Sequence, residues 1–73
     1  MFQAFIVKNH IRALRAEKYY SQSKLADLAG CSRNTIARLE RNNELPNLAL
    51  AYSIAKALDA EVSEVFEYQI EEY

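Results

Sequence analysis

Gly30, the only glycine of the chain, separates two short segments with helical periodicity. The first segment has an apolar face made by Leu25, Leu28 and Ala29. Ser21 is suited to cap the start of this helix, and Ser32 to cap the start of the next. A glycine just past a helix end adopts a positive φ without a Cβ clash, so we expect the first helix to stop at Gly30. The stretch 22–41 therefore predicts two short helices joined by a tight turn.

The second helix of this pair is expected to have two distinct faces. At about 100° per residue, Ile36 and Leu39 fall on one side of the helix. The opposite arc carries polar, cationic and small side chains: Arg33, Asn34, Ala37, Arg38 and Arg41. A helix face with arginines is usually only solvated surface. The tight turn before it favours a helix-turn-helix, in which this face is free to enter a DNA groove.

Charge is divided unevenly along the chain, although the net charge is only −1. Residues 8–43 contain eight Lys or Arg and three acids, a net charge of +5. Residues 44–73 contain one Lys and seven acids, a net charge of −6. A polyanion responds to the local field within about one Debye length, ~8 Å in physiological salt. The basic half, which holds the two helices, therefore favours a nucleic-acid partner.

The residue inventory argues against an enzyme. One His, one Cys and no Gly-rich loop leave no metal cluster, nucleophile dyad or phosphate cradle, so we expect no metal, cofactor or small-molecule ligand. Cys31 has no disulfide partner and suits a buried, inert thiol. With no signal peptide and no long apolar run, 73 residues indicate one cytoplasmic domain spanning 1–73 that does not engage a membrane.

The two ends of the chain predict short strands. Gln3–Val7 is rich in strand formers, and Phe66–Ile70 alternates apolar and polar side chains, so the two could pair. A loosely packed tail is the alternative for the first segment. Between these ends, Asn9 is a candidate cap for a first helix running to about Lys18. A fourth helix, 48–58, has Asn47 as its cap and a core stripe of Leu48, Ala51, Ile54, Ala55 and Leu58.

The sequence resembles the Cro/C1-type helix-turn-helix regulators of phages and bacteria. The apolar, small and glycine positions of that family are met by Leu25, Ala26, Ala29, Gly30, Cys31, Ile36 and Leu39. The match extends through S-R-x-T-I at residues 32–36 and P-x-L-x-L-A-x-x-I-A at residues 46–55, and it covers roughly residues 8–66. The resemblance implies an all-α, five-helix domain, with Val62–Phe66 as the last helix and a possible small antiparallel pairing of the terminal strands.

The resemblance also implies which residues would contact DNA. Those expected to meet base edges are Arg33, Asn34, Thr35 and Arg38, and Ala37 could touch a thymine methyl group. The hydroxyl of Thr35 lies toward the core side of the helix, which suits a cap or a phosphate better. The residues expected to contact phosphate are Gln22 first, then Ser21, Ser23, Lys24, Arg41, Asn42 and Asn43.

Two further roles follow from the resemblance and from chain length. Arg15 and Glu40 occupy positions that form an ion pair in the family, which would fix the second helix of the motif against the first helix of the domain. So small a monomer is not expected to bury Val62, Val65 and Phe66 together. These three residues and Tyr68 are therefore predicted to form a dimer interface.

Two functions remain open at this stage. The first is a homodimeric, sequence-specific DNA-binding transcriptional regulator, preferably a repressor, that reads a palindromic operator through the major groove. The alternative is an antitoxin-type module whose acidic C-terminal half binds a basic protein partner, and which also binds its own promoter.

Overall fold

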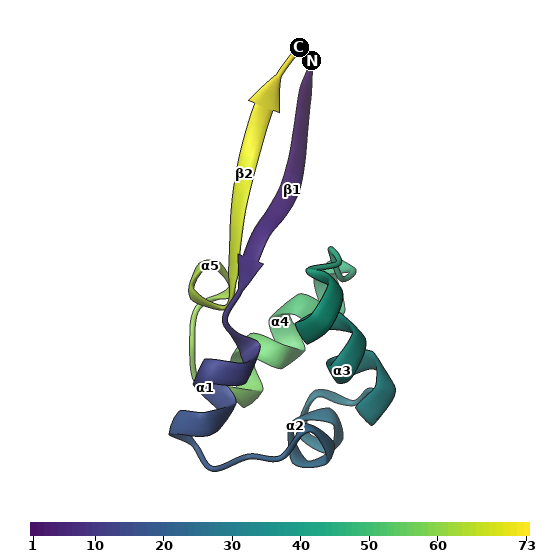
Figure 1. Cartoon of the computed structure of the whole chain (residues 1–73), viewed down its shortest axis with the longest axis vertical. Coiled ribbons are helices and arrows are strands. Elements are labelled where there is room, and N and C mark those ends of the chain that lie inside the picture. The colour runs from purple at the N-terminus through teal and green to yellow at the C-terminus, as the bar shows by residue number, and fades with distance from the viewer.

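The computed structural model describes all 73 residues as a helical body with a long two-stranded extension (Figure 1). In chain order the elements are β1 (Phe2–Asn9), α1 (Ile11–Glu17), α2 (Gln22–Ala29), α3 (Arg33–Asn42), α4 (Leu48–Ala57), α5 (Val62–Val65) and β2 (Phe66–Glu72). The molecule measures 40 × 20 × 20 Å, with the strands along its length. None of the five helices has the length and apolar character needed to cross a bilayer.

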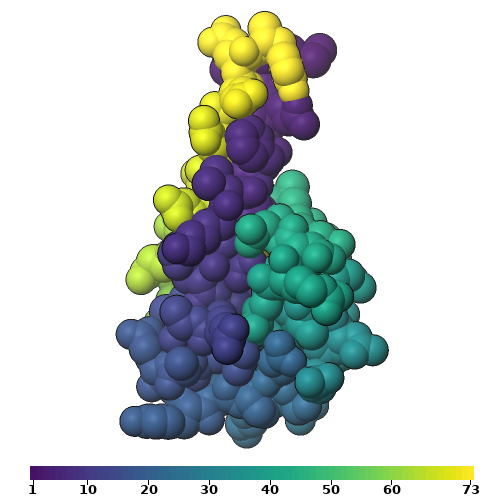
Figure 2. Space-filling view, viewed as in Figure 1, coloured from purple at the N-terminus to yellow at the C-terminus, as the bar shows by residue number.

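The two terminal strands pair along their whole length and form what we call the arm. β1 and β2 are antiparallel, with Phe2 opposite Glu72 and Ile6 opposite Tyr68, and a bulge lies between Ile6 and Lys8. The ends of the chain meet at the tip, where the N–H of Tyr73 donates to the carbonyl of Met1 at 2.8 Å. Figure 2 shows the arm tapering away from the body.

The all-α class is therefore not exact. The strands contain eight and seven residues, more than the predicted 3–7 and 66–70. They are longer because the hydrogen-bonded ladder continues to the chain ends, which a pattern of alternating side chains does not mark. The five helices and the antiparallel pairing of the ends are confirmed.

The predicted caps are confirmed in α2, α3 and α4. The side-chain oxygens of Ser21, Ser32 and Asn47 each accept from the backbone N–H of the third residue of the following helix, at 2.9, 3.1 and 2.8 Å. Gly30 ends α2 in the left-handed conformation with φ 76°. These local contacts set the short turn between α2 and α3.

Asn9 has a different role from the predicted cap of α1. His10 precedes that helix and makes no side-chain cap bond. Asn9 instead ends β1, and its Nδ2 donates to the carbonyl of Leu39 at 2.8 Å and to Oδ1 of Asn43 at 2.6 Å. Its Oδ1 still accepts weakly from the N–H of Ile11 at 3.3 Å. Asn9 thus joins the base of the arm to the end of α3.

Twelve buried apolar side chains form one core between the helices and the base of the arm. They are Ile11, Leu25, Ala26, Ala29, Ile36, Leu39, Ala51, Ile54, Ala55, Leu58, Val65 and Phe66. The predicted core stripes were wrong at Leu28 and Leu48, which are 48% and 72% exposed. Leu48 is the first residue of α4, so no preceding helical turn covers it.

Val65 and Phe66 are also corrections, because they are only 0% and 3% exposed and offer almost no surface to the predicted dimer interface. The body buries them because α5 packs against α4 and β2, and the N–H of His10 donates to the carbonyl of Val65 at 2.8 Å. Val62 is half-buried, and Tyr68 is exposed on the arm. Only these two of the four predicted residues keep substantial surface for a partner.

An ion pair between Arg15 and Glu40 joins α1 to α3. Nε and Nη2 of Arg15 donate to the two carboxylate oxygens of Glu40 at 2.8 and 3.1 Å, and the side chains are only 15% and 10% exposed. Nη1 of Arg15 donates to the carbonyl of Tyr20 at 2.9 Å. This bidentate geometry constrains the angle and position of α3 more strongly than a single bond.

We expect Gly30→Ala to destabilise the fold by about 1–2 kcal/mol, because an L side chain is strained in the left-handed region. A Cβ at this position meets no atom within 4 Å, so steric overlap adds nothing to that cost. Urea denaturation would measure the change as a lower midpoint at constant slope. Gly30→Asn is the control and should lose less, because asparagine tolerates this conformation. Equal stability of the alanine variant and the parent would contradict the prediction.

We expect Arg15→Ala to lower the free energy of unfolding by roughly 3 kcal/mol, because it leaves a largely buried carboxylate without its partner. Arg12→Ala is a matched control on the same helix, since Arg12 is exposed and forms no ion pair, and it should change stability little. The double variant Arg15→Met/Glu40→Leu should recover much of the loss. Chemical denaturation of the four proteins tests this, and similar losses for Arg15→Ala and Arg12→Ala would disprove it.

Candidate nucleic-acid interface

The two faces of α3 differ in exposure. Ile36 and Leu39 are buried, whereas Arg33, Asn34, Arg38 and Arg41 are exposed. The buried face packs on α2, and the capped turn before α3 leaves the first residues of the helix at the surface. The cationic side chains are therefore held on the outside of a fixed helix.

A concave surface of about 610 Å³ lies between α1, α2 and this face of α3, and we call it the basic depression. Its lining residues are Asn9, Arg12, Gln22, Arg33, Asn34, Ala37, Glu40 and Arg41. Three of these are arginines, and the only acid, Glu40, is paired with Arg15. The depression therefore combines positive charge with amide groups that can donate and accept hydrogen bonds.

Sequence reasoning missed Arg12 and Asn9 as members of this surface. A signal for Arg12 was present, because a residue three positions before Arg15 lies beside it on the same side of a helix. Arg15 was already expected to face α3, and the same spacing places Arg12 near that helix too, although the sequence analysis did not use it. For Asn9 there was no such signal, since its place depends on contacts with Leu39 and Asn43.

Thr35 and Ala37 occupy intermediate positions on α3. The hydroxyl of Thr35 lies 2.9 Å from Oγ of Ser32, and its N–H donates to the same oxygen. This hydroxyl is part of the helix cap, which limits its reach toward a base. Ala37 lines the basic depression and is half-buried, so its methyl group offers a small apolar contact there.

The start of α2 adds a second group of polar side chains. Ser21, Ser23 and Lys24 are exposed, and Gln22 lines the basic depression. Nε2 of Gln22 donates to Oε1 of Glu40 at 3.3 Å, which orients the amide and leaves its second N–H free. The free backbone N–H groups at a helix start favour an anion, so this region suits a phosphate.

Among the predicted phosphate contacts at the end of α3, Asn43 is less available than the sequence suggested. Asn43 adopts the left-handed conformation with φ 52°, and its N–H donates to the carbonyl of Leu39. Its Oδ1 accepts from Asn9, so only its side-chain Nδ2 remains for a phosphate. Arg41 and Asn42 are exposed, and Arg41 lines the depression.

Cys31 sits in the turn between α2 and α3 and is partly buried. Burial raises the pKa of this thiol, because desolvation disfavours the thiolate. The thiol therefore stays protonated at neutral pH and serves packing instead of reactivity.

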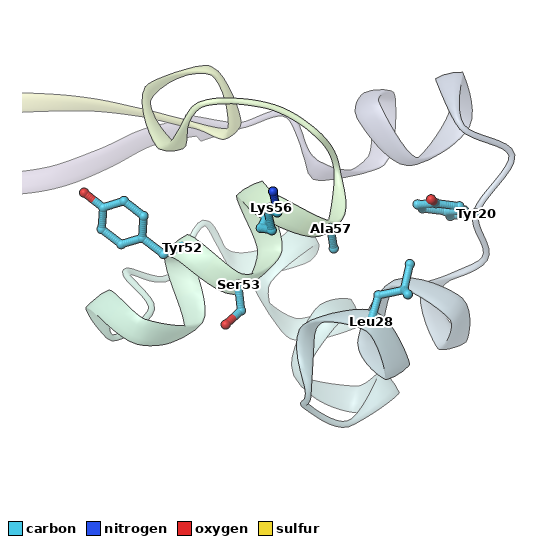
Figure 3. Close-up of a pocket in the computed structure, with 6 residues that line it drawn as sticks. All are labelled: Tyr20, Leu28, Tyr52, Ser53, Lys56 and Ala57. Carbon is cyan, nitrogen blue, oxygen red and sulfur yellow. The ribbon is translucent and has the colours of Figure 1, made fainter.

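A second hollow, of about 560 Å³, lies between α2, α4 and the loop after α1. It is lined by Tyr20, Leu28, Tyr52, Ser53, Lys56 and Ala57. Figure 3 shows that these side chains do not converge, since Tyr52 points away from Tyr20. It shares no residue with the basic depression, and none of the predicted DNA contacts lies in it.

A third concave surface, the apolar groove, lies between the arm and the start of α4. It encloses about 380 Å³, and its lining residues are Ala4, Phe5, Ile6, Leu45, Pro46, Leu48, Ala51, Val62, Phe66 and Tyr68. Leu45, Leu48 and Tyr68 are among the most exposed large apolar side chains of the body and the arm base. A cluster of this kind on a small protein is typical of a subunit contact.

Comparison with known proteins places the chain among transcriptional regulators. A family model described as helix-turn-helix matches residues 11–65. The HTH-type transcriptional regulator YgzD of Bacillus subtilis is 40% identical over 60 residues, which cover 82% of this chain and 91% of YgzD. The immunity repressor protein of Bacillus phage phi105 is 36% identical over 59 residues, covering 81% of this chain and 41% of the repressor.

Solved structures give the same result. The restriction-modification controller protein C.AhdI from Aeromonas hydrophila superposes with a TM-score of 0.70 at 36% identity, covering 75% of this chain and 83% of C.AhdI. The N-terminal DNA binding domain of SinR from Bacillus subtilis gives a TM-score of 0.68 at 33% identity, covering 73% of this chain and 78% of that domain. The chain belongs to the Cro/C1-type helix-turn-helix family, whose members are DNA-binding transcriptional regulators and not enzymes.

Proposed function

We propose that this protein is a homodimeric, sequence-specific repressor that places α3 in the major groove of a palindromic operator. The main support for the proposal is the basic depression, which Arg33 and Asn34 line at the start of α3. The Arg15–Glu40 ion pair holds this helix in place. Residues at that end of a recognition helix reach furthest into the groove. Repression is favoured over activation because the phage phi105 relative is an immunity repressor.

The side chains of α3 suit direct readout of bases. Arginine can donate two hydrogen bonds to O6 and N7 of guanine, and asparagine can pair with adenine through N6 and N7. Arg33, Asn34 and Arg38 are exposed and supply these groups on one arc of the helix. Each well-formed pair contributes about 1–3 kcal/mol of discrimination. The methyl group of Ala37 adds a possible contact with thymine.

Phosphate contacts would fix this helix in register. Gln22 leads this group, because its amide already lies in the basic depression and keeps one N–H free. Ser21, Ser23 and Lys24 lie at the same helix start, and Arg12, Arg41, Asn42 and the Nδ2 of Asn43 flank it. Such contacts are electrostatic, so affinity should fall as salt rises.

A second copy is expected to dock on the apolar groove. Single domains of this size make few DNA contacts, and two copies on half-sites about one helical turn apart would multiply them. Exposed Leu45, Leu48 and Tyr68, with half-buried Val62, provide apolar surface that a two-fold partner would cover. Of the four residues predicted for the interface, Val62, Phe66 and Tyr68 line this groove, and Val65 does not.

Arg33→Ala should reduce the preference for one operator base pair by about 1–3 kcal/mol while the fold survives, since Arg33 is exposed. Selection of bound fragments from random DNA, followed by competition binding, would measure this preference. Lys56→Ala is the control. It also removes a positive charge, but Lys56 lines the second hollow and not the basic depression. An unchanged operator and affinity for Arg33→Ala would show that α3 is not the reading element.

Leu48→Asp should convert the dimer to monomers, because a carboxylate would be buried in the apolar contact. The fold should tolerate the change, since Leu48 is exposed and an acid at the first position of a helix suits its dipole. Leu28→Asp is the matched control at an exposed leucine outside the groove. Sedimentation analysis gives the masses, and a dimeric Leu48→Asp variant would rule out this interface.

A further inference from the structure

We infer that Glu44 is a positioning residue that holds Arg38 ready to read a guanine. The inference rests on the proposed function, because it assigns a partner to one of the side chains that would read bases. Nε of Arg38 donates to Oε2 of Glu44 at 2.8 Å, and both side chains are about half exposed, 50% and 43%. Glu44 is thus an acid beside the exposed, cationic face of α3, a face proposed to bind the polyanion DNA.

The contact leaves the reading end of the arginine free. Only Nε of Arg38 has a hydrogen-bond partner in the chain, and neither Nη1 nor Nη2 has one. A guanidinium held at Nε still presents its two terminal nitrogens as a fork, which matches O6 and N7 of guanine. The bond to Glu44 therefore restricts the side chain without using the donors that a base would need.

The residue before Glu44 is held in place, since the N–H of Asn43 donates to the carbonyl of Leu39 at 3.2 Å. Asn43 turns the chain through the left-handed region, which brings Glu44 back toward Arg38, six residues earlier. The side chain of Asn43 is bound to Asn9, at the base of the arm. A defined chain of contacts therefore runs from Asn9 through Asn43 and Glu44 to Arg38.

Restricting Arg38 before binding should favour the correct base over others. A free arginine loses side-chain entropy when it is ordered on a base, and a held arginine loses less. An ion pair at the rim also offers Arg38 an alternative to a nearby phosphate, so the side chain is less free to bind backbone without regard to sequence. Glu44 itself repels phosphate, which lowers affinity for every sequence by the same factor.

The test measures base preference, position by position, on the operator selected from random DNA. Arg38→Ala identifies the position that Arg38 reads, because guanine preference is lost there. Glu44→Ala should reduce preference at that same position by about three- to tenfold and leave the other positions unchanged. Glu44→Gln, whose amide oxygen can still accept from Nε, should lose less preference while it binds all sequences more tightly.

A double variant separates positioning from a general effect of charge. In the Arg38→Ala background, Glu44→Ala should no longer change base preference at any position. Glu17→Gln is the charge control, since Glu17 is exposed at the end of α1 and makes no ion pair. Thermal melting of each variant shows whether the fold is intact.

The inference fails if folded Glu44→Ala keeps full guanine preference at the Arg38 position, or shifts preference equally at every position. That result differs from failure of the proposed function, in which no sequence would be enriched from random DNA by the parent protein.

Discussion

The bidentate ion pair between Arg15 and Glu40 is the interaction on which the placement of α3 depends. It joins α1 to α3 and also engages the carbonyl of Tyr20 and the amide of Gln22. Burying two charges yields little net stability, because desolvation offsets much of the attraction. The main effect of the pair is to fix the orientation of α3 relative to α1, since planar groups that share two hydrogen bonds allow few relative orientations. Removing it would loosen both α3 and Gln22, the residue proposed to lead the phosphate contacts.

The parts of the fold that sequence predicted well are those set by contacts within a few residues. Ser21, Ser32 and Asn47 each bond a backbone N–H three positions on, and Gly30 ends a helix through its own φ angle. Such interactions need no knowledge of the rest of the molecule. The exposed arc of α3 followed from the same logic, because helical spacing alone separates it from Ile36 and Leu39.

The parts that sequence predicted poorly depend on how segments pack against one another and on where each helix begins. Val65 and Phe66 are buried because the base of the arm and α5 pack on the body, which no local pattern reveals. Leu48 has the right spacing for a core residue, yet α4 begins there and nothing covers it. Asn9 was predicted to cap α1, but its side chain binds Leu39 and Asn43 and so links β1 to the end of α3. For Asn9 these partners lie 30 and 34 residues away in the sequence.

The shape of the molecule is one reason why a chain of net charge −1 presents a basic surface. Two of the acids of its C-terminal half, Glu71 and Glu72, lie in β2 near the tip of the arm (Figure 1). The molecule is 40 Å long, several times the Debye length of ~8 Å in physiological salt. Charges at the tip are therefore screened from a surface on the body, where α1, α2 and α3 meet. Separation along the arm therefore keeps Glu71 and Glu72 from weakening the field that a DNA phosphate would meet.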